Sequence, residues 1–100
     1  MHNEVIFQQK FIYDPTSPTG LRYRKNKKPA GFKNHGGYWV VQARAFGETL
    51  TWSIARALFE LVHQVELTRA LVVVPLDGDY TNFKINNLAA VPMAHVTHKI

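Results

Sequence analysis

The chain has 100 residues, of which 46% are hydrophobic, and its formal net charge is +5 at pH 7. This length and apolar content indicate one small folded domain and exclude an intrinsically disordered chain. The sequence has no cysteine, which excludes disulfides, thiolate zinc sites and cysteine nucleophiles, and no apolar run is long enough to cross a bilayer.

The positive charge is concentrated in the first half of the chain. Residues 1–44 contain eight Lys or Arg and two Asp or Glu, whereas residues 45–100 contain four and five. Six of the basic residues lie between Arg22 and Lys33. Because a local excess of positive charge attracts polyanions, the partners that the sequence favours are nucleic acid or an acidic protein surface.

The first quarter of the chain predicts two short strands joined by a turn. Residues 5–13, VIFQQKFIY, are rich in β-branched and aromatic side chains, which is typical of a strand. Residues 14–20 contain two prolines and a glycine and predict a turn. Residues 21–25 predict a second strand, in which alternation places Arg22 and Arg24 on one face.

Residues 26–37, NKKPAGFKNHGG, predict a loop because they contain three glycines, one proline and three lysines. Two interpretations of the lysines remain open at this point. They keep a hairpin connection soluble, or they form a flexible basic arm that contacts phosphates, which requires little geometry beyond the charge itself.

Residues 38–45, YWVVQARA, predict the clearest strand of the chain. Alternation gives it one apolar face that should meet the core, made of Trp39, Val41, Ala43 and Ala45. The opposite face ends in Gln42 and Arg44, side chains that can read base edges or hold phosphates, or that simply form the solvated face of a sheet. Residues 49–52 can pair back as the next strand.

Residues 54–64 predict an amphipathic helix, and Ser53 is a suitable N-cap. Its apolar face consists of Ile54, Ala57, Leu58, Leu61, Val62 and Val65. The polar face includes Arg56 and Glu60, whose spacing of four residues allows a weak ion pair.

Residues 71–88, LVVVPLDGDYTNFKINNL, predict a short buried strand, a tight turn at Asp77-Gly78 and an asparagine-rich loop. The segment resembles that of small phage-type HNH homing endonucleases, V-D-H-I-D-G-D-x-x-N-N-x-x-x-N-L. The spacing of Asp77-Gly78-Asp79 and of Asn87-Leu88 matches this pattern, and Asn82 matches the first asparagine of the family's pair. Upstream, Gly37-Tyr38, Phe46-Gly47 and Arg56-Ala57-Leu58 are similar to motifs of the same family. A sheet packed on one helix also resembles the Apetala-type DNA-binding domain.

The sequence departs from the family at the positions that carry chemistry. Pro75 stands where the family places the histidine that activates water, and proline has no proton-accepting group. Val74 replaces an acidic residue that is often a metal ligand. His95 or His98 falls near the family's last catalytic position, but residues 89–100 predict a frayed tail. We therefore expect no catalytic residue, no metal, no other cofactor and no enzymatic activity.

These observations predict an α+β fold: a small antiparallel β-sheet of three to four strands packed on one central helix, followed by an HNH-like strand-loop-strand remnant. We expect a single domain over residues 1–100, with the sheet and helix in 1–66 and the remnant and tail in 67–100. The predicted core includes Trp39, Val41, Leu58, Leu61, Val72 and Val74.

The predicted function is nucleic-acid binding without cleavage, by a phage-type protein derived from an HNH endonuclease, with double-stranded DNA as the favoured partner. The residues expected to contact it are Arg22, Arg24, Lys25, Lys27, Lys28, Lys33, Gln42 and Arg44. The alternative is a small phage protein that inhibits a host enzyme or defence complex by binding an acidic or nucleic-acid-binding host protein. Either function places the protein in the cytoplasm of the host cell, away from membranes.

Overall fold

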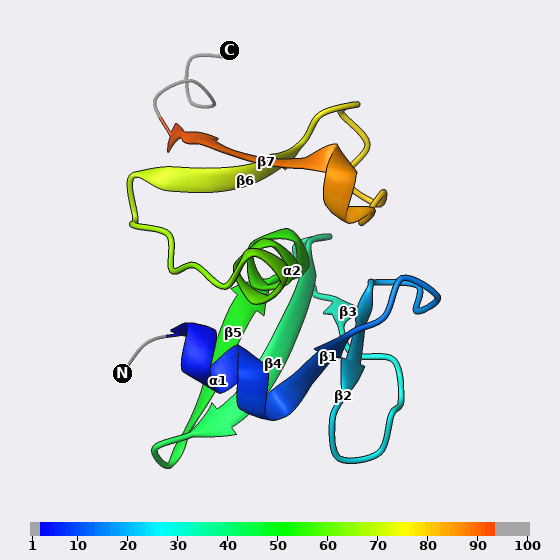
Figure 1. Ribbon diagram of the computed structural model, residues 1–100, viewed down its shortest axis with the longest axis vertical. Coiled ribbons are helices and arrows are strands. Elements are labelled where there is room, and N and C mark those ends of the chain that lie inside the picture. The colour runs from blue at the N-terminus through cyan, green and yellow to red at the C-terminus, as the bar shows by residue number, and fades with distance from the viewer. Residues whose placement is uncertain (1–2, 94–100) are drawn as a thin grey trace.

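The computed structural model describes residues 3–93 (Figure 1). In chain order the elements are α1 (Asn3–Lys10), β1 (Phe11–Tyr13), β2 (Leu21–Tyr23), β3 (Phe32–Lys33), β4 (Trp39–Ala45), β5 (Glu48–Ser53), α2 (Ile54–His63), β6 (Leu71–Pro75), the 3-10 helix η1 (Ile85–Asn87) and β7 (Leu88–Pro92).

The strands form three small antiparallel sheets, β1-β2, β3-β4-β5 and β6-β7. Helix α2 lies between the β6-β7 hairpin and the remaining elements (Figure 1). This arrangement confirms the predicted mixed α+β class with one main helix. Within the described residues, no helix is long and apolar enough to cross a membrane.

The N-terminal strand predicted over residues 5–13 is wrong for most of its length, because residues 3–10 are helical and only residues 11–13 form a strand. The β-branched and aromatic composition masked a helical spacing. Phe7 and Phe11 are four residues apart, both are fully buried, and their ring centroids lie 6.4 Å apart. Phe7 also packs edge-on against Trp52 of β5, at 4.8 Å between centroids, which fixes α1 to the central sheet.

The β4-β5 hairpin confirms the predicted strands and the predicted faces of β4. Val41 is fully buried, whereas Gln42 and Arg44 are exposed on the other face. The prediction of an unbroken loop over residues 26–37 is wrong in part, because Phe32 and Lys33 form the third strand of this sheet opposite Val40 and Trp39.

Helix α2 supplies the centre of the core. Its N-terminus is capped as predicted, since the backbone N–H of Arg56 donates to Ser53 Oγ at 3.1 Å. The core cluster consists of Phe7, Phe11, Leu21, Ala30, Val41, Ile54, Ala57, Leu58, Leu61 and Leu88. Residues from both the N-terminal part and the β6-β7 hairpin therefore share one apolar interior.

Glu60, predicted on the polar face of α2, has a fully buried side chain. The connection between α2 and β6 covers this side of the helix. The expected ion pair with Arg56 is present at 3.0 Å. Arg56 also donates to the carbonyl oxygens of Leu67, Thr68 and Leu71, at 2.6, 3.0 and 2.8 Å, so one guanidinium holds the whole connection against the helix.

The predicted core residues of β6 were placed on the wrong face of that strand. Val73 packs half-buried against the core, and Pro75 is buried, whereas Val72 and Val74, also half-buried, are not part of the core packing and pair with Val91 and Ala89. A run of four apolar residues has no alternation, so its pattern does not show which face meets the helix. Val41, Leu58 and Leu61 are buried as predicted, and Trp39 packs half-buried against them.

Candidate nucleic-acid interface

A groove of about 770 Å³ lies between the junction of α1 and β2 and the end of the β4-β5 hairpin. It is lined by Gln9, Lys10, Tyr23, Lys25, Asn26, Gln42, Ala43, Arg44 and Thr49. Three of these residues are cationic and none is acidic. We call this surface the basic groove. It combines a net positive charge with amide side chains, which is the chemistry that contacts nucleic-acid backbones and base edges.

Two of the predicted binding residues, Gln42 and Arg44, extend across β5 from the exposed face of β4. Gln42 Nε2 donates to Thr51 Oγ1 at 3.1 Å, and Arg44 donates to Thr49 Oγ1 at 3.2 Å and to the Gly47 carbonyl at 3.3 Å. Because a guanidinium has five N–H donors, these two bonds orient Arg44 and leave donors for an anionic partner.

The opposite wall of the basic groove carries Lys10 and Lys25. The backbone N–H of Arg24 donates to the Lys10 carbonyl at 2.9 Å, which brings the end of α1 beside the end of β2. Lys10 was missed by the sequence analysis because residues 5–13 were assigned to a strand. A helical assignment would have placed Lys10 in the last turn of a helix, but its position beside Arg24 and Lys25 depends on how α1 packs.

Two predicted binding residues, Arg22 and Arg24, have partners inside the protein. Arg22 Nε lies 2.7 Å from Asp14 Oδ2, and its guanidinium also donates to the Lys27 carbonyl. Hydrogen bonds from Thr16 and Arg22 lower the pKa of Asp14 to about 2. Arg24 donates to the carbonyl oxygens of Gln8 and Phe11. Both arginines therefore hold β2 against its neighbours, and neither lines the basic groove.

The remaining predicted lysines lie elsewhere on the surface. Lys27 and Lys28 are exposed in the turn after β2, where Lys27 has a left-handed backbone with φ of 62°. Lys33 is exposed on β3 and lines a different cavity, together with Tyr38. The structure thus gathers Lys25, Gln42 and Arg44 from the predicted set into one groove.

The loop between β6 and β7 is organised around Asp77. Its carboxylate accepts hydrogen bonds from Asn82 Nδ2 at 2.8 Å, from Asn87 Nδ2 at 3.1 Å and from the backbone N–H of Asp79 at 2.8 Å. These bonds, with that from Asn82 first, lower the pKa of Asp77. Both oxygens of Asp77 are therefore engaged in closing the loop, which is the turn role that the sequence predicted.

Pro75 pairs with Leu88 at the end of the hairpin and is buried. A strand with only one partner tolerates proline, because the missing N–H can lie on its unpaired edge. Over residues 3–93 there is no group of three or more His, Cys, Asp or Glu side chains that could hold a metal ion. His95 and His98 lie outside the described residues.

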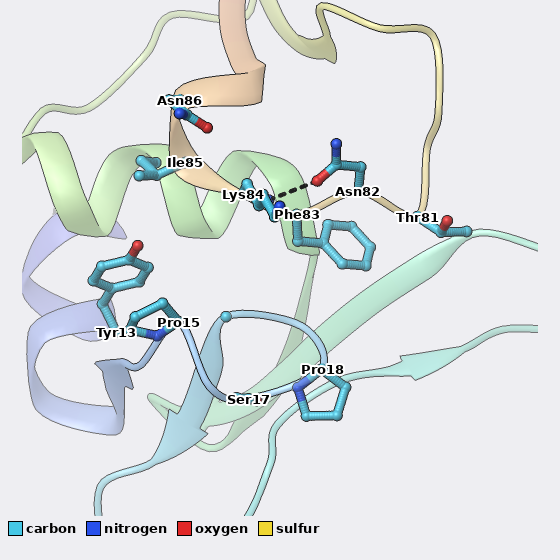
Figure 2. A pocket seen from close by; sticks show the side chains of 11 residues that line it. Tyr13, Pro15, Ser17, Pro18, Thr81, Asn82, Phe83, Lys84, Ile85 and Asn86 are labelled. Carbon is cyan, nitrogen blue, oxygen red and sulfur yellow. Dashed lines mark hydrogen bonds between the residues drawn. The ribbon is translucent and has the colours of Figure 1, made fainter.

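A second groove, of about 540 Å³, separates the β1-β2 turn from the loop before β7. Figure 2 shows Tyr13, Pro15 and Pro18 on one side and Phe83 and Lys84 on the other. Asn82 Oδ1 accepts a hydrogen bond from the Lys84 backbone N–H at 3.2 Å. Lys84 is the one charged residue in this lining, so this surface offers a polyanion less than the basic groove does.

The fold is similar to that of the HNH homing endonuclease I-HmuI, whose solved structure describes DNA binding and cleavage. The two superimpose with a TM-score of 0.60 at 18% identity, over 86% of this chain and 52% of the endonuclease chain. This chain therefore spans about half the length of that protein. The likeness confirms the fold predicted from the resemblance to HNH homing endonucleases. No protein-family model matches the sequence, and no curated protein matches it.

Proposed function

We propose that this chain is a phage-type protein derived from an HNH endonuclease, and that it binds double-stranded DNA through the basic groove without cleaving it. The observation that carries this proposal is the convergence of Lys10 of α1, Lys25 of the turn after β2 and Arg44 of β4 on one groove without an acidic residue. Phosphates are the ligands that such a set of cations binds, and Gln42 beside them can donate to a base edge.

The likeness to a DNA-binding endonuclease supports the same choice of partner. A protein that kept the fold while losing its catalytic groups would retain the surfaces that hold DNA. HNH chemistry requires a base that deprotonates water and a metal that stabilises the leaving oxygen. Pro75 and Val74 supply neither at the matching positions, and Asp77 is held by Asn82 and Asn87.

Fluorescence polarisation with a labelled DNA duplex tests binding. Three phosphate contacts predict a slope of about −3 for the logarithm of affinity against the logarithm of salt concentration. Lys25→Gln and Arg44→Gln should each reduce that slope by about 1. Lys84→Gln and Arg69→Gln are matched controls, because they remove the same charge from exposed sites outside the basic groove. A DNA affinity that does not change with salt concentration, or that falls equally in all four variants, would contradict the proposal.

Nicking of supercoiled plasmid in magnesium, manganese or zinc tests the absence of cleavage. We expect no nicking by the purified protein. Metal-dependent nicking that is lost in Asp77→Ala would show that the loop carries an active site after all. The alternative, inhibition of a host enzyme or defence complex, would be supported if a host protein stays bound in stoichiometric amount after nuclease treatment in a pull-down and the purified chain binds no DNA.

A further inference from the structure

A third cavity, of about 440 Å³, lies where the central sheet meets the loop between β6 and β7. Four of its lining residues are aromatic: Tyr38, Trp39, Tyr80 and Phe83. Lys33 is the one charged residue in the lining. We call this cavity the aromatic cleft. It brings two parts of the chain that are about forty residues apart onto one surface.

Two of the four rings form a floor, and two are exposed walls. Trp39 and Phe83 are half-buried against the core, with ring centroids 6.2 Å apart in an edge-to-face arrangement. Tyr38 and Tyr80 are 72% and 67% exposed, although both are large aromatic residues. The floor is explained by packing between the two parts of the molecule, whereas the two exposed rings contribute little to that core.

Tyr38 is carried by a short hydrogen-bonded turn. Its backbone N–H donates to Asn34 Oδ1 at 2.9 Å, and its carbonyl accepts from the Asn34 N–H at 2.8 Å. The Tyr38 ring lies so close to Gly36 that a Cβ there would stand 3.2 Å from it. The ring is therefore supported by the turn rather than free in solvent.

Tyr80 lies in a second hydrogen-bonded turn. Asp79 accepts hydrogen bonds from the Thr81 N–H and Oγ1, at 2.9 and 2.7 Å, and its carbonyl accepts from the Asn82 N–H. The backbone that carries each wall of the aromatic cleft is thus fixed before any ligand arrives, which reduces the conformational entropy lost on binding.

The chemistry of the aromatic cleft fits an unstacked nucleobase. Every base offers a π-face, and stacking on tyrosine or tryptophan is the usual way in which proteins hold bases that have left the duplex. The Lys33 ammonium adds a cation for the phosphate of the same nucleotide. A purely apolar partner would use the rings but leave Lys33 unpaired at the edge of the interface.

We propose that the aromatic cleft binds an unpaired base of a DNA strand, with its phosphate against Lys33. This inference rests on the proposed function, because the rest of the DNA would lie in the basic groove. β4 carries residues of both surfaces, and Trp39 and Arg44 are five residues, or about 17 Å, apart along the strand and lie on its opposite faces. DNA that contacts both surfaces therefore passes round an edge of the sheet and spans at least about five nucleotides.

The test compares two labelled duplexes of the same sequence, one fully paired and one with a single bulged base at its centre. Wild-type protein should bind the bulged duplex at least about fivefold more tightly. Tyr38→Ala and Tyr80→Ala should each remove most of this preference and leave binding of the paired duplex unchanged. Phe46→Ala is the matched control, because Phe46 is 64% exposed but lies outside the lining of the aromatic cleft.

The outcomes separate this inference from the proposed function. Equal, salt-dependent binding of both duplexes by the wild-type protein would overturn the inference and leave the proposed function standing. If the protein binds only the bulged duplex, and Tyr38→Ala abolishes this binding, the result would support the inference and overturn the proposed binding of fully paired DNA. A dimer that dissociates on Tyr38→Ala, without a preference for the bulge, would assign the aromatic cleft to a second copy of the chain and overturn the inference.

Discussion

The carboxylate of Glu60 lies 3.0 Å from the guanidinium of Arg56, one turn earlier on α2, and it is fully buried. Its Oε2 also accepts a hydrogen bond from the Leu67 backbone N–H at 3.2 Å, whereas Oε1 has no hydrogen-bond partner among the described residues. Burial raises the pKa of Glu60 above its ordinary value of 4.5, and the bonds from Leu67 and Arg56 offset only part of this effect.

This pKa shift predicts a pH dependence of stability. A raised pKa in the folded state means that the folded protein binds this proton more tightly than the unfolded chain does. The stability that the protonated carboxyl contributes is therefore full below pH 4.5 and is lost as the pH rises from 4.5 through the raised pKa. The free energy of unfolding of the wild type, minus that of Glu60→Gln, should fall over this range by at most about 1.4 kcal/mol per pH unit.

Urea unfolding of both proteins at a series of pH values measures this difference. Taking the difference removes the contributions of carboxylates that titrate equally in both proteins, such as Asp14 and Asp77. A difference that rises with pH would mean that Glu60 is stabilised as the anion and that the ion pair with Arg56 outweighs burial.

Asp14 predicts the opposite behaviour in acid. Hydrogen bonds from Thr16 and Arg22 lower its pKa from 3.8 to about 2. The carboxylate therefore stabilises the fold at pH values above 3.8, and this stabilisation is lost as the pH falls towards 2. An NMR titration should show the Asp14 carboxyl changing near pH 2, and Asp14→Asn should be less stable than the wild type at pH 5 but not at pH 2. Titration of Asp14 at its ordinary pKa would show that the hydrogen bonds from Thr16 and Arg22 do not persist in solution.

Gly31 joins the lysine-rich turn to β3, and an added side chain there would be strained. Its φ is +110°, and a Cβ there would collide with Ile54 Cδ1 at the start of α2. Gly31→Ala should lower the free energy of unfolding by about 1–3 kcal/mol. Gly47→Ala is the matched control, because Gly47 also has a positive φ, of 76°, but has nothing within 4 Å of the added Cβ. Equal losses in the two variants would mean that backbone strain alone, rather than contact with Ile54, sets the cost.

Phe46 occupies the first position of the two-residue turn between β4 and β5. Its φ is 56° and that of Gly47 is 76°, which is the geometry in which Asn-Gly is strongly preferred. Phe46→Asn should therefore raise the free energy of unfolding by about 0.5–1 kcal/mol. Phe46→Ala removes the ring without relieving the backbone and should not stabilise. If Asn and Ala have the same effect in urea unfolding, the ring rather than the backbone determines the stability of this turn.

The sequence predicted the parts of the fold that depend on local chemistry. Alternation placed Val41 inside and Arg44 outside, and Ser53 capped α2 as expected, because these signals do not depend on distant residues. The loop around Asp77 was also predicted, as capping and turn chemistry, since Asp and Asn side chains bond to nearby backbone.

Features set by tertiary packing were not predicted. The β-branched and aromatic composition before Phe11 favoured a strand, and contact with Trp52 on β5 stabilises a helix there instead. The burial of Glu60 depends on the connection that folds back over α2, which has no local signal. Lys10 joined the candidate interface for the same reason, because its position depends on the packing of α1 beside β2.

Helix α2 packs on α1, β4 and β5 with one side and on β6 and β7 with the other. Neither part of the chain can therefore open without exposing the apolar surface on which the other part depends. Unfolding should be a single cooperative transition, and slow amide exchange in β4 should report on substitutions made in the hairpin. Val73 belongs to β6, which makes no backbone hydrogen bond to β4 within the three sheets. Val73→Ala should nevertheless accelerate amide exchange in β4 as much as in β6.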